Sequence, residues 1–118
     1  MSITYAPRKI IADLGAGTDR TSSVSDLSLY NVASVQLTWI GLTGTPNGVL
    51  TVEVSDDGVN WDTKKLSSGS DATITVSGAA GTDVLSIENV TEKFYRTKWA
   101  KTGVTGGTIA CLIMAKGS

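Results

Sequence analysis

The segment VLTVEVSDDGVNWDT (residues 49–63) joins a strand pattern to a turn pattern and decides the fold class of this chain. Apolar and polar residues alternate through VLTVEVS, which predicts a β-strand with one buried face because successive strand side chains point to opposite sides. The Asp-Asp-Gly sequence follows at once, and Gly58 can supply the positive φ that a tight turn requires. The segment therefore predicts a β-hairpin, with Trp61 at the start of the returning strand.

The same alternation recurs along the chain, and no stretch of a dozen residues places apolar residues at helical spacing. Polar or glycine-rich turns separate the alternating segments at intervals near ten residues, which is typical of sandwiches and barrels. We therefore predict an all-β, antiparallel β-sandwich, jelly-roll-like, with eight to nine short strands and no substantial helix. Besides VLTVEVS, the clearest strand segments are SVQLTWIG (34–41), ATITVSG (72–78), DVLSIEN (83–89) and KFYRTKWAK (93–101).

The length of 118 residues suits a single sandwich domain over residues 1–118. Residues 1–14 are predicted to be an N-terminal arm or an edge strand. Residues 15–26 lack a strand pattern and are predicted to be a loop or the boundary behind that arm. TGTPNG (43–48) has the Pro and Asn-Gly of a hairpin turn, and KTGVTGG (101–107) predicts a looser turn before the last strand.

The composition excludes several classes of function. Ten basic and eleven acidic residues give a net charge of -1, which argues against nucleic-acid binding by bulk electrostatics. The sequence has no histidine, the commonest general base and metal ligand, and the single Cys111 lies in an apolar run that predicts burial. We expect no enzyme activity, no catalytic residues, no metal and no cofactor. No segment has the pattern of a secretory signal or of a membrane span, so no membrane partner is expected.

The hairpin is also the best candidate for a binding site. Asp56, Asp57, Asn60 and Asp62 are oxygen ligands of the kind calcium prefers, but their order does not match a calcium loop. Turn capping by the same side chains is the favoured interpretation. Trp61 could stack on a sugar ring, so Trp61, Asp57 and Asn60 are the candidate contacts for a glycan or partner.

Two apolar segments are candidates for contacts between subunits. TIACLIMA (108–115) is apolar on both strand faces, as in a central strand covered on both sides or a strand that faces another subunit. The N-terminal segment could clasp a neighbouring chain. The predicted interface residues are Ile10, Ile11, Leu112 and Met114.

The hairpin resembles a turn found in discoidin-like sandwich domains, where a strand ends in Ser-Asp-Asp-Gly and a Trp follows. KFYRTKW, with its Tyr95-Arg96 pair, resembles a later strand of the same domains. The whole layout is similar to small structural proteins of bacteriophage virions. That similarity covers about residues 33–64 and 92–115, through VQLTW, the Asp-Gly-x-Asn-Trp turn and Tyr95-Arg96.

The phage resemblance implies a virion structural protein: a capsid-associated, decoration, or minor capsid or tail component that acts through repeated subunit contacts. Its implied partners are other virion subunits, as a homo-oligomer, and its implied location is the virion, assembled in the host cytoplasm. The alternative is a carbohydrate- or surface-binding sandwich module that uses the loops near Trp61.

Overall fold

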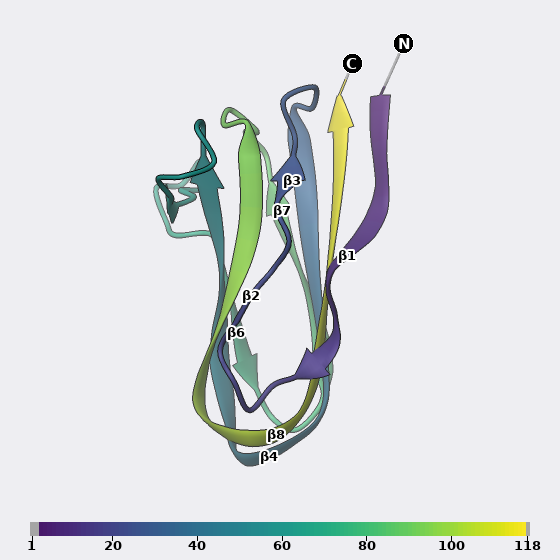
Figure 1. The fold of residues 1–118 in the computed structure, drawn as a ribbon, viewed down its shortest axis with the longest axis vertical. Helices are drawn as coiled ribbons and strands as arrows, with labels where there is room; N and C mark the ends of the chain where they lie inside the picture. Colours follow the sequence, from purple (N-terminus) through teal and green to yellow (C-terminus); the bar gives the residue numbers. More distant parts are fainter. Residues whose placement is uncertain (1–2, 118) are drawn as a thin grey trace.

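The computed structural model describes residues 3–117 and contains eight β-strands and no helix. The strands form one antiparallel sheet that is folded over into an elongated body of 45 × 26 × 26 Å (Figure 1). The predicted fold class, an all-β antiparallel sandwich without substantial helix, is confirmed. The strands are β1 (Ile3–Gly15), β2 (Arg20–Thr21), β3 (Ser25–Asp26), β4 (Val32–Ser55), β5 (Asp62–Thr63), β6 (Thr73–Ser77), β7 (Gly81–Ile87) and β8 (Phe94–Gly117).

Two long strands, β4 and β8, organise the whole fold. Each has 24 residues, and they pair antiparallel from Val32 opposite Lys116 to Ser55 opposite Phe94. Their register shifts several times between Ile40 and Gly48, where both strands bend around one end of the molecule (Figure 1). The pair therefore starts in one layer of the sandwich and ends in the other.

This bend corrects the prediction of a hairpin at TGTPNG (43–48). The segment is the corner of β4, and the strand on each side of it pairs with β8 rather than with the other half of β4. KTGVTGG (101–107) is the matching corner of β8. Glycines with positive φ occur in both corners, as they do where a strand must bend sharply: Gly41 and Gly44 in β4, and Gly103 and Gly107 in β8.

Each layer consists of one half of the long pair with shorter strands on either side. In the first layer, β1 pairs with the C-terminal half of β8, and β7 pairs with the N-terminal half of β4. In the second layer, β2 and β3 pair with the N-terminal half of β8, while β5 and β6 pair with the C-terminal half of β4. The strand order across the first layer is therefore β1-β8-β4-β7.

The core lies between the layers and is built from the alternating faces that the sequence predicts. Trp99 and Tyr95 are its largest fully buried side chains. Because successive side chains of a strand point to opposite faces, only one face of each strand points toward the other layer. The inward side chains of the two layers therefore pack against each other and exclude water from the space between the layers. The predicted inward residues that are buried are Val35, Leu37, Trp39, Leu50, Val52, Val54, Ala72, Ile74, Val76, Ile87, Tyr95, Thr97 and Trp99.

The N-terminal strand β1 forms an edge of the first layer and is interrupted by bulges. Its register against β8 shifts between Lys9 and Ile11, which lets two consecutive side chains point the same way. Ile10 is only 5% exposed and Ile11 only 1%, both within the chain's own core. The bulge turns both side chains toward the core, so neither is exposed for the predicted contact with a second subunit.

Residues 15–26 form a strap across the second layer instead of a free loop. The buried Ser22 accepts a hydrogen bond from the Thr97 N–H (2.8 Å), and the Trp99 indole donates to the Ala16 carbonyl (3.0 Å). These bonds replace ladder pairing where β2 and β3 are interrupted.

In the part of the chain that the structure describes, no helix is long and apolar enough to cross a membrane.

Trp99 fits only because Gly48 has no side chain. A Cβ at Gly48 would lie 2.2 Å from the ring of Trp99, a distance that forces either the ring or the strand to move. We predict that Gly48→Ala lowers the free energy of unfolding by about 1–3 kcal/mol, the usual cost of overpacking a core. Urea denaturation followed by tryptophan fluorescence measures the loss.

Gly15→Ala is the matched control for this substitution. A Cβ at Gly15 would meet only the flexible end of the Arg20 side chain, at 3.3 Å. We expect Gly15→Ala to change the free energy of unfolding by less than about 1 kcal/mol. Equal losses from the two substitutions would contradict the packing role given to Gly48.

Candidate functional site

The loop after β4 is shaped by Ser55 and Asp57, two of the residues in the segment that predicted the hairpin. The Ser55 hydroxyl accepts a hydrogen bond from the Gly58 N–H (2.9 Å) and donates to Asp57 Oδ1 (2.8 Å). Asp57 Oδ1 also accepts from the N–H groups of Val59 and Asn60, each at 2.8 Å. Gly58 has a φ of 76°, as predicted for the turn.

The Asp57 carboxylate accepts its hydrogen bonds from groups of its own loop. Hydrogen bonds from the N–H groups of Asn60 and Val59 hold the pKa of Asp57 well below its ordinary value. The second carboxylate oxygen accepts from the Asn60 side-chain amide at 2.8 Å. The structure thus brings the predicted contacts Asp57 and Asn60 together, but their polar groups bond to the loop itself. Within residues 3–117, no cluster of three metal-ligating side chains is present.

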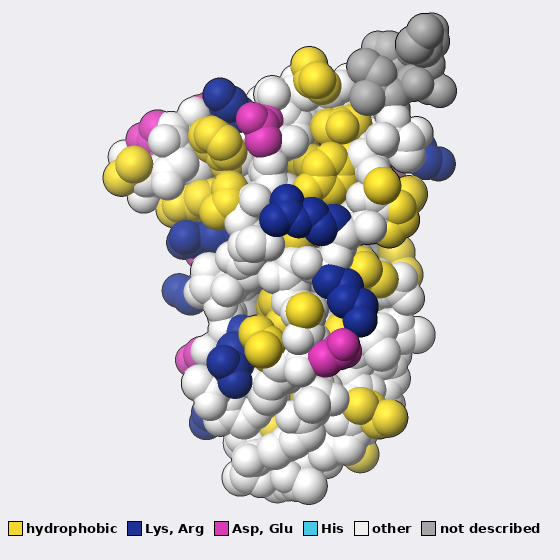
Figure 2. All heavy atoms as spheres, turned by 45° about the vertical axis from the view of Figure 1, so that its right-hand side comes forward, with side chains coloured by type: hydrophobic (Ala, Val, Ile, Leu, Met, Phe, Trp, Pro, Cys, Tyr) yellow, Lys and Arg dark blue, Asp and Glu magenta, His cyan; other side chains and the backbone are white. Residues whose placement is uncertain are grey.

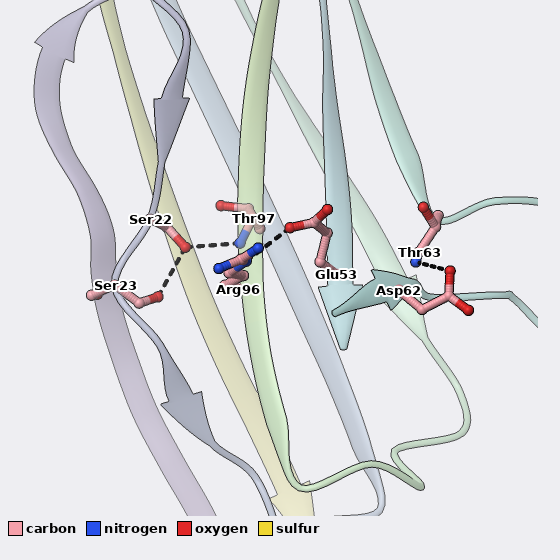
Figure 3. A network of polar contacts seen from close by, with 7 residues as sticks. All are labelled: Ser22, Ser23, Glu53, Asp62, Thr63, Arg96 and Thr97. Carbon is pink, nitrogen blue, oxygen red and sulfur yellow. Dashed lines mark hydrogen bonds and ion pairs between the residues drawn. The ribbon is translucent and has the colours of Figure 1, made fainter. Parts of the chain in front are cut away.

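Trp61 lies on the outside of the second layer, where one face of its ring is covered. The Arg96 guanidinium sits 4.1 Å from the ring centroid, and Arg96 Nε donates to Glu53 Oε1 at 2.8 Å. Figure 3 shows Arg96 on β8 reaching toward Glu53 on the neighbouring strand β4. Such a cation–π stack on a ring holds the loop against the sheet. Trp61 therefore holds the returning segment against the sheet and offers at most one ring face to a ligand.

A polar cleft of about 590 Å³ opens beside this loop. Asp56, Asp62 and Lys65 lie along it, opposite Asn89 and Thr91 of the loop before β8. Trp61, Asp57 and Asn60 are not among its lining residues. The structure thus separates the aromatic ring from the cleft, whereas the sequence interpretation placed sugar stacking and hydrogen bonding at one site.

Lys64 and Glu92, which also line the cleft, belong to a charged network that the sequence interpretation missed. Lys64 Nζ donates to Glu92 Oε1 at 2.9 Å, and the Tyr95 hydroxyl donates to the same oxygen at 2.8 Å. The Lys64 side chain is only 5% exposed and that of Glu92 26%. Lys64 is held there because its N–H donates to Val52 and its carbonyl accepts from Ala72.

The network changes the ionisation of both acidic groups. Burial acts to raise the pKa of Glu92, but hydrogen bonds from Lys64 and Tyr95 outweigh it, so the net pKa lies below the ordinary 4.5. Burial first, and then the hydrogen bond to Glu92, raises the pKa of Tyr95. The Tyr95 hydroxyl therefore remains a protonated donor to the carboxylate at neutral pH. The network therefore braces the end of the core.

The remaining predicted residues fall into two classes. Cys111 is fully buried, and burial raises the pKa of its thiol to about 11, so the thiol is protonated and shielded from solvent. Leu112 and Met114 point outward from the first layer and are half-buried among their neighbours, on strand positions opposite to the buried Cys111 and Ile113. They remain available as candidates for contact with another chain.

We predict unequal effects from the two ends of the Lys64–Glu92 pair. Glu92→Gln leaves a buried ammonium without its counter-charge and should cost about 1–3 kcal/mol in unfolding free energy, less than for a fully buried pair because Glu92 is partly exposed. Lys64→Met leaves a carboxylate that still reaches solvent and Tyr95, and it should cost less. Urea denaturation at pH 7 compares the two variants.

The pH dependence provides the control. Because the fold lowers the pKa of Glu92, its stabilisation is complete above pH about 4.5 and is lost as the pH falls through the lower folded pKa. Glu92→Gln should therefore lose less stability than the wild type between pH 5 and pH 3. An identical acid dependence in both proteins would show that Glu92 does not hold this role.

Comparison with known proteins identifies similar folds. No family model matches the chain, and no curated protein sequence matches it. The SPBc2 prophage-derived protein YomS aligns with a TM-score of 0.64 at 6% identity, over 98% of this chain and 95% of that one. The PBSX exported protein XepA aligns with a TM-score of 0.63 at 17% identity, over 96% of this chain, which spans only 37% of XepA.

Two further folds are relevant to the possible functions. A chain of the Bacillus endospore appendages, described as disulfide-linked pili, aligns with a TM-score of 0.52 at 19% identity, over 100% of this chain and 92% of that one. A structure described as a CBM4 aligns with a TM-score of 0.51 at 8% identity, over 83% of this chain and 60% of that one. At these identities the likeness establishes the fold, and the discoidin-like hairpin is not among the features it supports.

Proposed function

We propose that this chain is a structural protein of a bacteriophage virion that acts through repeated contacts between subunits and catalyses no reaction. The observation that carries the proposal is the whole-chain likeness to prophage-derived YomS, which covers 98% of one chain and 95% of the other. The likeness to a pilus chain, over 100% of this chain, supports a role in assembly.

The side-chain chemistry supports the same role. Asp57 and Asn60 bond within their loop, Lys64 and Glu92 bond to each other, and Arg96 is shared between Trp61 and Glu53. Groups engaged in this way stabilise a subunit and are not poised to transfer protons or attack substrates. Because Cys111 is buried, it is not exposed to form a disulfide between subunits, in contrast to the disulfide-linked pili.

The proposal is tested on particles made by a host that carries the gene for this chain. We expect the chain to co-sediment with density-purified phage particles, to survive a high-salt wash, and to be present in many copies per particle by quantitative mass spectrometry. Free chain added to particles that lack it serves as the control for adsorption. Expression of the chain in the host together with its absence from washed particles would refute the proposal.

The alternative, a carbohydrate-binding module, has specific support from the CBM4 likeness and from the polar cleft beside the Trp61 loop. Affinity electrophoresis against soluble polysaccharides separates the two functions. Under our proposal we expect no retardation of the wild-type chain. Retardation that disappears in Trp61→Ala and persists in Val59→Ala, an exposed neighbour on the same loop, would favour the binding module.

A further inference from the structure

The outer face of the first layer presents aligned rows of side chains across all four strands. In one row, Lys9 of β1, Leu112 of β8, Gln36 of β4 and Val84 of β7 are successive partners. Partners in an antiparallel sheet share a face, and the intervening positions such as Ile113 are buried, so this row points away from the core. We call this surface the outer face.

Three polar side chains in the middle of the outer face, Gln36, Thr38 and Thr82, bond to one another. The Gln36 amide donates to the Thr82 hydroxyl at 3.2 Å, and the Thr38 and Thr82 hydroxyls lie 3.2 Å apart. Thr82 in turn donates to the Leu37 carbonyl at 3.2 Å. Covering this part of the face would leave few of its polar groups unpaired, which is the main cost of burying a polar surface.

The outer face has one protruding side chain and one hollow, and these two features are complementary in shape. Val84 stands out on the β7 side and is 56% exposed. On the other side, a hollow of about 140 Å³ is lined by Pro7, Gln36, Leu112 and Met114. The protrusion and the hollow lie in the same and adjoining rows, with Val84 on β7 and the hollow over β4, β8 and β1.

The charges of the outer face are also divided between its two sides. Lys9 and Lys116 belong to the β1 and β8 side, with Asp13 paired to Lys9 at 3.1 Å, whereas Glu88 follows directly after β7. Glu88 and Lys116 border one hollow of about 240 Å³ that includes Met114. Figure 2 shows the side of the molecule on which β1 lies, where Lys and Arg side chains are more prominent than Asp and Glu.

We propose that a second copy of this chain packs on the outer face about a two-fold axis parallel to the strands. Such an axis places the β7 side of each copy over the β1 and β8 side of the other, at the same height along the strands. Val84 of each copy then enters the hollow beside Leu112, and Glu88 approaches Lys116 of the other copy. This inference rests on the proposed function, since it names the surface for one of the repeated contacts.

The available area suits a contact of this kind. Four strands about 4.8 Å apart, of which β7 contributes its seven residues and the others about nine each at 3.3 Å per residue, give roughly 550 Å² per copy. Two copies would bury about 1,100 Å², near the lower limit for specific interfaces, so association of the free chain is expected to be weak. Neighbouring contacts in an assembled particle would strengthen it.

The sheet edges are less suitable for the same partner. The Asp83 carboxylate accepts a hydrogen bond from the Val84 N–H at 2.9 Å, which occupies a donor on the edge of β7. The edge of β1 contains Pro7 and several bulges. Such features discourage the addition of a strand from another chain, so the face is the better docking surface.

The first experiment measures self-association by analytical ultracentrifugation from 5 to 500 μM. The wild type should show a concentration-dependent dimer, and Val84→Glu should raise the dissociation constant at least tenfold because it places a charge in the hollow. Val59→Glu is the matched control, since Val59 is exposed on the distant Trp61 loop, and it should associate like the wild type. Thermal unfolding by circular dichroism verifies that both variants remain folded.

The second experiment reverses the charges. Lys116→Glu and Glu88→Lys should each weaken the dimer, and an equimolar mixture of the two variants should restore it, because the mixed dimer places Glu opposite Lys between copies while each copy keeps like charges at its own positions 88 and 116. A strict monomer up to 500 μM, or a dimer that Val84→Glu and both reversals leave unchanged, would overturn this inference. Neither outcome decides the proposed function, which depends on incorporation into particles.

Discussion

The pairing of β4 with β8 is the constraint on which the rest of this structure depends. Because the two strands remain hydrogen-bonded from Val32–Lys116 to Ser55–Phe94, bending one requires bending the other. The glycines of both corners permit that bend without a clash between side chain and backbone. The β4–β8 pair is therefore one long two-stranded ribbon that forms the centre of both layers. Each shorter strand pairs with this ribbon and widens one of the two layers.

The packing of the core follows from the same bend. Folding the ribbon over brings the inward faces of the two layers together, and the largest rings meet the smallest residues. Trp99 lies against Gly48, and Trp39 lies against Gly81, each where a Cβ would be too close. Because the backbone and the ring approach each other closely, no void remains between them at which the surrounding atoms would lose dispersion contacts. The glycines are thus needed for two reasons, bending in the corners and room beside the tryptophans.

At the end of the molecule opposite the corners, polar interactions take over from apolar packing. The loop after β4 closes on Asp57, Arg96 holds Trp61 against the second layer, and Lys64, Glu92 and Tyr95 brace the end of the core. The charged and polar side chains that are candidates for a functional site in the sequence therefore bond to one another and stabilise the fold. The outer face of the first layer is different, because its side chains are uneven in shape and divided in charge.

Much of this fold follows from the sequence alone. Period-two alternation determined the all-β class and the inward residues from Val35 to Trp99, since a strand side chain has only two directions to choose between. The turn at Gly58 and the burial of Cys111 were equally local consequences. Only the tertiary structure decided that 43–48 is a corner, that a bulge turns Ile10 and Ile11 inward, and that Lys64 meets Glu92 beneath Tyr95. Each of these depends on which distant strands pair and in what register, and alternation along one strand contains no information about its partner.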